Sequence, residues 1–203
     1  MPIDFRPAHV NDVETAIALI YSSGPEAFEY GFTHDNDRSQ DFLRFAFSHG
    51  LGFLGWRNHT VALVDDSVVG IGAFYSGKDY LRLSIGMVWQ VLCFYPLPTV
   101  PRVIMRLLQL QALMPAPGRD TYYVAHFAVL ANQRSQGVGS ALLSYQQSVA
   151  RRLGFKKYAL DVAIDNPKAL ALYQRLGFKQ MAQQRFPGRI GQVPDTLRME
   201  MDC

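Results

Sequence analysis

The feature that most constrains the fold is a nearly unbroken apolar run from Tyr122 to Leu130. A run of this kind predicts a strand that is covered on both faces of its sheet. A helix is predicted from Gly137 to Leu153, where Gly154 stops it, and a second strand follows from Tyr158 to Ile164. A strand, a helix and a strand in this order predict a right-handed crossover between two parallel strands. We therefore expect an α/β fold built around this unit.

Shorter patterns on either side of this unit predict further strands and helices. Ile3 to Arg6 alternates as a strand does, and a helix capped by Asn11 or Asp12 follows it. Pro25 to Phe32 is predicted to be an aromatic, acidic connection. The other predicted elements are a helix from Gln40 to Ser48, a hairpin of Thr60–Val64 with Val68–Tyr75, a short helix from Pro167 to Leu176, and closing strands at Phe178–Phe186 and Thr196–Met201 joined by Pro187–Gly191.

The stretch from Lys78 to Asp120 interrupts the strand pattern with two apolar segments, Tyr80 to Tyr95 and Arg102 to Met114. A proline-rich stretch separates the two segments, so we expect two helices inserted into a single domain that covers residues 1–203. We expect these helices to pack on their own domain, and an interaction or membrane-surface element formed by Tyr80 to Met114 is the alternative. No uncharged apolar run is long enough to span a bilayer, so no stable membrane insertion is expected.

Charge and cysteine content argue against several other classes of protein. Twenty Lys and Arg against seventeen Asp and Glu leave a net charge of +3 and no basic tract, so nucleic-acid binding is not indicated. Cys93, Cys203 and the histidines show no metal-ligand spacing, so no metal site is expected. The opening residues lack the regions of a secretory signal, and we expect a cytoplasmic protein.

One short segment between the buried strand and the next helix has the composition of an anion-binding turn. Such a turn aims consecutive backbone N–H groups at one point beside the positive end of the helix dipole, which suits a phosphate. No Lys-Ser or Lys-Thr pair follows, and Leu142 takes the third glycine position of a dinucleotide fingerprint, so nucleotide hydrolysis and hydride transfer lose support. A tight turn that merely needs flexible residues stays an alternative. The segment consists of Arg134, Ser135, Gln136, Gly137, Val138 and Gly139.

A second block, Asn166 to Phe178, follows the next predicted strand. Together the two blocks resemble the GNAT superfamily of acyl-CoA dependent N-acyltransferases, whose pattern is Arg or Gln, two residues, Gly, one residue, Gly or Ala, then Asn, Ala, Leu-Tyr and Gly-Phe. The match is specific from Val124 to Phe178, and the opening Phe5 to Ala8 with Asp12 is similar as well. The resemblance implies a mostly antiparallel sheet with a central parallel βαβ pair, flanked by helices.

The resemblance also implies roles for particular residues. The segment from Arg134 to Gly139 matches the loop around the pyrophosphate of acetyl-CoA, and Asn166 matches a residue that is bonded to this cosubstrate. Tyr173 matches the general acid that protonates the departing thiolate; its alternative role is a core aromatic residue on an amphipathic helix. The strand end that pairs with the pantetheine arm is matched by Phe127, Ala128 and Val129.

The general base for direct acetyl transfer stays open among four residues. The site on the buried strand where the family carries a base is matched by Tyr123, which could act through a water molecule. His126 lies nearby, but strand alternation predicts it on the face opposite Tyr123, where a hydrogen-bonded core histidine is the simpler reading. Glu26 and Glu29 lie in the connection where the family lines its acceptor site, or they are a solvated helix start.

The acceptor predicted from the resemblance is an amine of a small molecule or a peptide. A protein that binds acyl-CoA as a sensed ligand, with little turnover, is the alternative function, and Tyr173 favours the enzyme. The insertion from Lys78 to Asp120 precedes the cofactor motif and leaves it intact. We therefore expect it to shape the acceptor side or a subunit contact, and a homodimer is left open.

Overall fold

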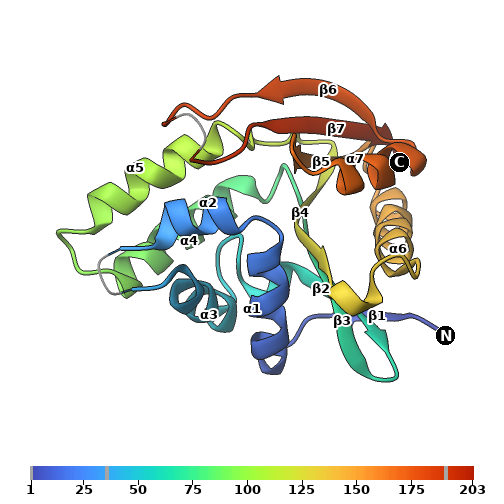
Figure 1. The fold of residues 1–203 in the computed structure, drawn as a ribbon, viewed down its shortest axis with the longest axis horizontal. Coiled ribbons are helices and arrows are strands. Elements are labelled where there is room, and N and C mark those ends of the chain that lie inside the picture. The colour runs from blue at the N-terminus through green and yellow to red at the C-terminus, as the bar shows by residue number, and fades with distance from the viewer. Residues whose placement is uncertain (1, 35–36, 190–191) are drawn as a thin grey trace.

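The computed structural model describes residues 2–34, 37–189 and 192–203, and the strands in this part of the chain form one sheet (Figure 1). Their order is β1-β2-β3-β4-β5-β7-β6, and every neighbouring pair is antiparallel except β4 with β5. This is the predicted mixed, mostly antiparallel sheet with a parallel pair. The strands are β1 (Asp4–Pro7), β2 (His59–Val64), β3 (Ser67–Ser76), β4 (Thr121–Val129), β5 (Lys157–Ala163), β6 (Lys179–Gln184) and β7 (Thr196–Asp202).

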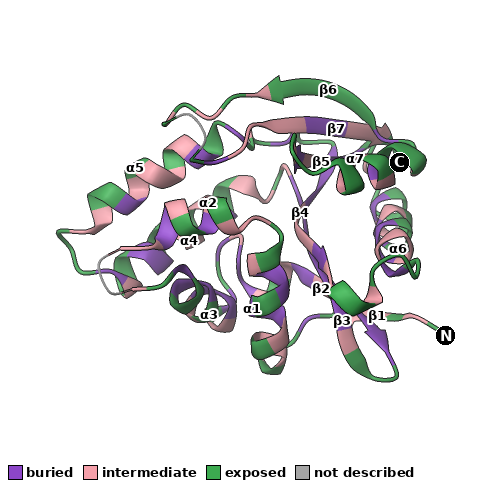
Figure 2. Cartoon of the chain, viewed as in Figure 1, coloured by how far each residue is buried: buried purple, intermediate pink, exposed green. Residues whose placement is uncertain are grey.

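Helices cover both faces of this sheet (Figure 1). Buried residues follow the central strands, whereas β6 at the sheet edge is exposed along most of its length (Figure 2). One face carries α1 (Val13–Ser22), α2 (Pro25–Phe32), α3 (Ser39–His49), α4 (Tyr80–Phe94) and α5 (Val100–Gln111), and the other carries α6 (Val138–Arg152) and α7 (Pro167–Arg175).

The predicted closing pair is confirmed, since β6 and β7 are antiparallel neighbours. β7 lies between β5 and β6, so the last strand of the chain is inserted beside the parallel pair. The connection between β6 and β7 was predicted at Pro187 to Gly191, and its residues 190 and 191 lie outside the described part of the chain.

The predicted hairpin of β2 and β3 is confirmed. Val64 pairs with Ser67, so the loop is the two residues Asp65 and Asp66, whose φ angles are 48° and 60°. Positive φ at both positions is the geometry of a type I′ turn, which matches the twist of the strands that it joins.

The prediction that Pro25 to Phe32 is only a connection is wrong, because these residues form helix α2. Gly24 and Pro25 do end α1, but the proline then occupies the first turn of the next helix. A proline is tolerated there because its missing N–H has no helical partner in any case.

The two helices predicted between β3 and β4 are present as α4 and α5. α5 begins at Val100, earlier than predicted, because Pro101 fits the first helical turn. Leu83, Val91 and Val103 are each at most 1% exposed, so the inner faces of both helices belong to the hydrophobic core.

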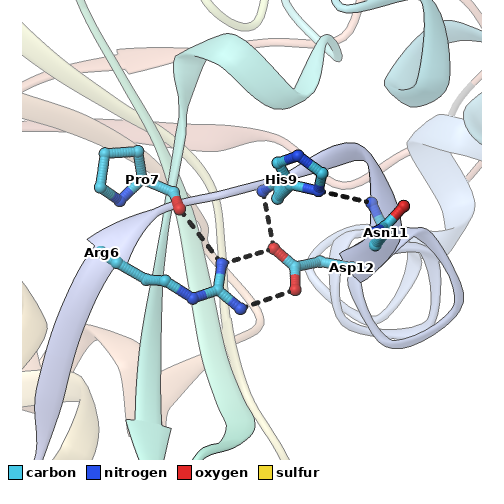
Figure 3. Close-up of polar contacts among 5 residues, drawn as sticks. All are labelled: Arg6, Pro7, His9, Asn11 and Asp12. Carbon is cyan, nitrogen blue, oxygen red and sulfur yellow. Dashed lines mark hydrogen bonds and ion pairs between the residues drawn. The ribbon is translucent and has the colours of Figure 1, made fainter.

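The start of α1 is held by an ion pair rather than by the predicted side-chain cap (Figure 3). Arg6 donates two hydrogen bonds to the Asp12 carboxylate, at 2.7 and 2.8 Å, and the backbone N–H of His9 donates a third at 2.7 Å. The hydrogen bonds from Arg6 are the largest cause that lowers the pKa of Asp12. The Asp12 carboxylate is therefore engaged with β1, and neither it nor Asn11 caps α1.

A bulge in β4 reverses the predicted orientation of His126. His126 has a φ of 51°, and the pairing of β3 with β4 shifts between Ile71 and Ala73, which leaves Gly72 opposite the bulge. The His126 ring consequently contacts Phe28 of α2, with ring centroids 5.8 Å apart. The prediction that His126 lies on the face opposite Tyr123 is therefore wrong, because an extra residue in a strand breaks the alternation of side chains.

A buried polar network joins three strands to the insertion. Asp161 on β5 accepts two hydrogen bonds from its cross-strand partner Arg198, both at 2.8 Å, and one from the Tyr123 hydroxyl at 2.6 Å. The side chains of Asp161 and Arg198 are 2% and 9% exposed. Arg198 also donates to the carbonyl of Pro115 at 2.5 Å, which ties the end of the insertion to β7.

We predict that Arg198→Met lowers the free energy of unfolding by about 3–5 kcal/mol, because it leaves the Asp161 carboxylate buried without its cation. The matched control is Lys157→Met, which removes the exposed ion pair of Lys157 with Asp202 from the same pair of strands. The control should change stability little. Denaturant unfolding measures both, and equal losses would contradict the assignment of a buried network.

Candidate active site

The parallel strands β4 and β5 separate part-way along their length. Their pairing covers only Thr121–Val124 against Lys157–Leu160, although β4 continues to Val129. Past Val124 no strand in the described part of the chain pairs with β4 on that side. Unpaired backbone groups at a sheet edge can bind an extended ligand as an added strand. The predicted pantetheine-binding residues Phe127, Ala128 and Val129 lie in this unpaired stretch.

The predicted anion-binding segment forms the turn into α6. Gly137 precedes the helix with a φ of 85°, which a glycine adopts without strain, and no side chain caps the helix start. The N–H groups of the first turn therefore stay available to an anion. Arg134 and Gln136 brace the turn instead, since Arg134 Nε donates to the carbonyl of Val129 at 3.1 Å and Gln136 Nε2 to that of Asn132 at 2.9 Å.

Phe127 connects this turn to the predicted general acid. A Cβ at Gly139 would lie 3.4 Å from the Phe127 ring, which is an ordinary van der Waals contact, so the turn packs against this strand residue. The Phe127 ring centroid lies 6.4 Å from that of Tyr173 on α7. The end of β4, the turn and Tyr173 are thus brought together, although they are distant in the sequence.

Tyr173 is placed to act as a proton donor. Its side chain is 7% exposed, and burial raises the pKa of its phenol well above the ordinary value. The hydroxyl is therefore protonated at neutral pH. Tyr173 also packs against Phe178, with ring centroids 5.8 Å apart, so the core role and the donor role are compatible.

Asn166 serves as the N-cap of α7. Its Oδ1 accepts a hydrogen bond from the backbone N–H of Ala169 at 3.1 Å. Capping α7 is thus a structural role for Asn166. Its Nδ2 group can still donate hydrogen bonds.

Two stacked histidines, His126 at the bulge and His59 on β2, lie on the side of the sheet where α2 and α3 pack. The rings of His126 and His59 are 5.6 Å apart and inclined by 14°. His59 Nδ1 lies 2.9 Å from the carbonyl of Gly55, whereas His59 Nε2 and His126 Nδ1 are buried without a partner in the described structure. Burial is the main cause that lowers the pKa of His126 to about 3 and that of His59 to about 4, so both rings are neutral at physiological pH.

Tyr123 is held as a hydrogen-bond donor. Its hydroxyl points to Asp161 at 2.6 Å, and burial together with this carboxylate raises its pKa well above 10. Tyr123 would have to give up its hydroxyl proton before it could act as a base. That proton is instead held in the hydrogen bond to Asp161.

Glu26 and Glu29 line an open hollow of about 530 Å³ between α2 and α5. The Glu29 carboxylate accepts hydrogen bonds from the hydroxyls of Tyr21, Thr33 and Ser39, and the bond from Thr33 is the largest cause that lowers its pKa. Glu29 is consequently ionised at neutral pH. The wall residues are Pro25, Glu26, Glu29, Tyr30, Thr33, Arg106 and Gln192.

Sequence patterns missed three residues of this region. Arg106 of α5 reaches the hollow, donates to the carbonyl of Thr33 at 2.8 Å and lies over the Tyr30 ring. Pairing of the strands brings His59 to His126 and Asp161 to Tyr123. No spacing in the sequence links the members of either pair.

The sequence model of the acetyltransferase (GNAT) family matches residues 19–178. The chain belongs to this family. Its members take acetyl-CoA as cosubstrate, and the prediction of an acyl-CoA dependent N-acetyltransferase family is thereby confirmed.

Individual relatives agree with this membership. An N-alpha-acetyltransferase of Saccharolobus solfataricus is 25% identical over 87% of this chain and 80% of its own length. N-alpha-acetyltransferase 30 of Schizosaccharomyces pombe is 32% identical, over 28% of this chain and 37% of that protein. The crystal structure of an N-acetyltransferase from Staphylococcus aureus Mu50 has the same fold, with a TM-score of 0.73, 18% identity, and coverage of 98% of this chain and 100% of that one.

Two features are absent from the described residues. None of the helices has the length and apolar character needed to cross a bilayer. Within the same residues, no three His, Cys, Asp or Glu side chains gather where they could hold a metal ion.

We predict that Gly137→Glu weakens acetyl-CoA binding by about tenfold to a hundredfold, because a carboxylate then competes for the N–H groups of the turn. Gly154→Glu is the matched control, since Gly154 also has positive φ and open space around it but follows the opposite end of α6. Both variants carry the same backbone strain. Titration calorimetry with acetyl-CoA decides, and unchanged affinity in folded Gly137→Glu would remove the turn from the binding site.

Proposed function

We propose that this protein transfers the acetyl group of acetyl-CoA directly to the α-amine of a peptide. The observation that carries the proposal is the meeting at Phe127 of three features: the unpaired end of β4, the uncapped start of α6 and the buried phenol of Tyr173. An anion site, an extended-ligand site and a proton donor together suit an acyl-CoA thioester. We place the reaction in the cytoplasm, in line with the sequence prediction.

Three parts of the chain would bind the cosubstrate. Backbone N–H groups from Gly137 to Gly139 would hold the pyrophosphate, and the free edge of β4 from Phe127 to Val129 would pair with the pantetheine arm. Asn166, at the start of α7, would add a donor through its Nδ2 group. Bound acetyl-CoA supplies a thioester carbonyl for attack by the amine and a thiolate as leaving group.

We assign proton removal from the amine to the imidazole of His126. This ring is neutral, lies on the acceptor face and sits at the bulge where β4 leaves β5. A weakly basic imidazole suffices because the amine nitrogen becomes strongly acidic once it bonds to the acetyl carbon. Tyr123 donates to Asp161 instead, and Glu29 is occupied by three hydroxyl donors.

We assign protonation of the leaving sulfur to the Tyr173 hydroxyl. Because burial keeps this phenol protonated, it can donate as negative charge develops on the sulfur. The proposed base and the proposed acid lie on opposite faces of β4, because His126 contacts α2 and Tyr173 lies on α7.

The hollow beside α2 supports a peptide as acceptor. Ionised Glu29, with Glu26 beside it, attracts an ammonium group, and Arg106 on the opposite wall offers donors to a peptide carbonyl. α5 joins this hollow to the β6–β7 connection, because Leu110 and Leu113 pack with Val193. We therefore propose that the insertion shapes the acceptor side. The relatives named N-alpha-acetyltransferases agree with a peptide α-amine.

The function is tested by an acceptor panel of peptides with free or blocked N-termini and small primary amines, with thiol release from acetyl-CoA as the signal. Peptides with a free α-amine should react fastest. Preference for small amines would overturn the peptide assignment, and binding of acetyl-CoA without turnover would favour the ligand-sensing alternative.

Tyr173→Phe should lower kcat by about tenfold to a thousandfold and leave acetyl-CoA affinity unchanged, because only the proton donor is lost. Tyr158→Phe is the matched control, since Tyr158 is also buried in this cluster and its hydroxyl has no partner in the described structure. The control should keep its activity. Wild-type kcat in Tyr173→Phe would reduce Tyr173 to a packing residue.

His126→Gln should lower kcat by about a hundredfold or more. In the wild-type protein, the pH dependence of kcat/KM should show no titration of this histidine. With a pKa of about 3 the ring is neutral from about pH 5 to about pH 8, so kcat/KM should rise with pH along the titration of the acceptor amine alone. Profiles with two acceptors of different basicity check this. A limb near pH 6.5 common to both acceptors would contradict the assignment.

A further inference from the structure

Helix α4 exposes an apolar face to solvent. Leu81, Ile85 and Trp89 are 71%, 63% and 59% exposed, although residues of this kind are normally turned inward. The opposite face of α4 is already buried through Leu83 and Val91. The exposed positions of this helix, which we call the α4 face, are Leu81, Arg82, Ile85, Val88, Trp89, Leu92 and Cys93.

The spacing of the apolar residues makes the α4 face a continuous stripe. Residues 81, 85, 88, 89 and 92 recur every three or four positions, which aligns them along one side of a helix. A helix that is apolar on all sides is normally covered on all sides. Three further exposed side chains of the same insertion, Leu97, Met105 and Leu108, add apolar surface. A contiguous surface of this kind indicates a binding partner.

The charge of the insertion indicates what that partner is. The insertion from Lys78 to Asp120 contains five Lys and Arg and two Asp, so it contributes +3. Because the whole chain carries +3, all other residues together carry no net charge. The excess positive charge of the protein is therefore confined to the segment that carries the α4 face. An anionic partner complements it.

We propose that the α4 face binds peripherally to an anionic phospholipid surface. An interfacial helix lies parallel to the membrane with its apolar side in the headgroup region and arginines beside the phosphates, and a tryptophan suits that depth. Asp79, which precedes the helix, pairs with Arg82 at 3.3 Å, so the positive charge of the insertion is only partly balanced within it. A second copy on the same face would bring together two insertions that each carry +3. The lipid surface is therefore the better match.

The chain contains a native probe for this contact. It has two tryptophans, and Trp56→Phe leaves Trp89 as the only one. Added to vesicles of equal parts phosphatidylcholine and phosphatidylglycerol, this variant should sediment with the lipid and shift its emission to the blue. Vesicles of phosphatidylcholine alone, or high salt, should weaken binding, because part of the attraction is electrostatic.

The decisive variant is Leu81→Gln with Ile85→Gln, which removes apolar surface without changing charge. It should lower vesicle binding by at least about tenfold. The matched control is Leu153→Gln with Met181→Gln, which removes two side chains of similar exposure, 63% and 60%, outside the insertion, and it should bind as the parent does. Acetyl-CoA affinity should be unchanged in both, which separates this test from that of the active site.

Three outcomes would overturn the proposal. The first is absence of vesicle binding by a folded parent protein, and the second is equal loss of binding in both double variants. The third is a dimer in sedimentation velocity that Leu81→Gln with Ile85→Gln converts to a monomer without any vesicle binding. That result would assign the α4 face to a second copy of the chain.

Discussion

The separation of β4 from β5 beyond Val124 is the constraint on which the site depends. Two strands that stayed paired to their ends would satisfy each other's backbone groups and leave no edge for an extended ligand. The bulge at His126 accompanies this separation and turns the imidazole toward α2. Strand geometry thus supplies both the cofactor edge and the orientation of the proposed base.

Burial divides the chemical roles among the titratable groups. It keeps His126 and His59 neutral and keeps Tyr173 protonated, so the fold holds a proton acceptor and a proton donor in complementary states. Tyr123 and Asp161 are engaged with Arg198 and serve the sheet instead. Among these buried groups, His126 and Tyr173 are therefore the ones suited to the proposed chemistry. Tyr123 and Asp161 hold the strands together.

The insertion between β3 and β4 packs on the core with its inner faces and exposes an apolar face of α4 to solvent. Its inner faces bury Leu83 and Val103 in the core, and its end is tied to β7 through Arg198 and Pro115. α5 also brings Arg106 to the hollow at α2. The outward side of α4 has no such partner in the described part of the chain, which is why we propose that it contacts a lipid surface.

The sequence by itself determined the parallel βαβ unit, the hairpin at Asp65 and Asp66, and the family, because periodicity, turn residues and motif spacing are local properties of the chain. Helix α2 escaped this reasoning because Pro25 reads equally well as a break and as a helix start. The position of His126 could not be predicted, since a bulge depends on how β3 and β4 pair and not on β4 alone. Only the tertiary structure brought Arg106 to Glu29, His59 to His126 and Tyr173 to Phe127, because each contact joins residues whose separation in sequence carries no signal.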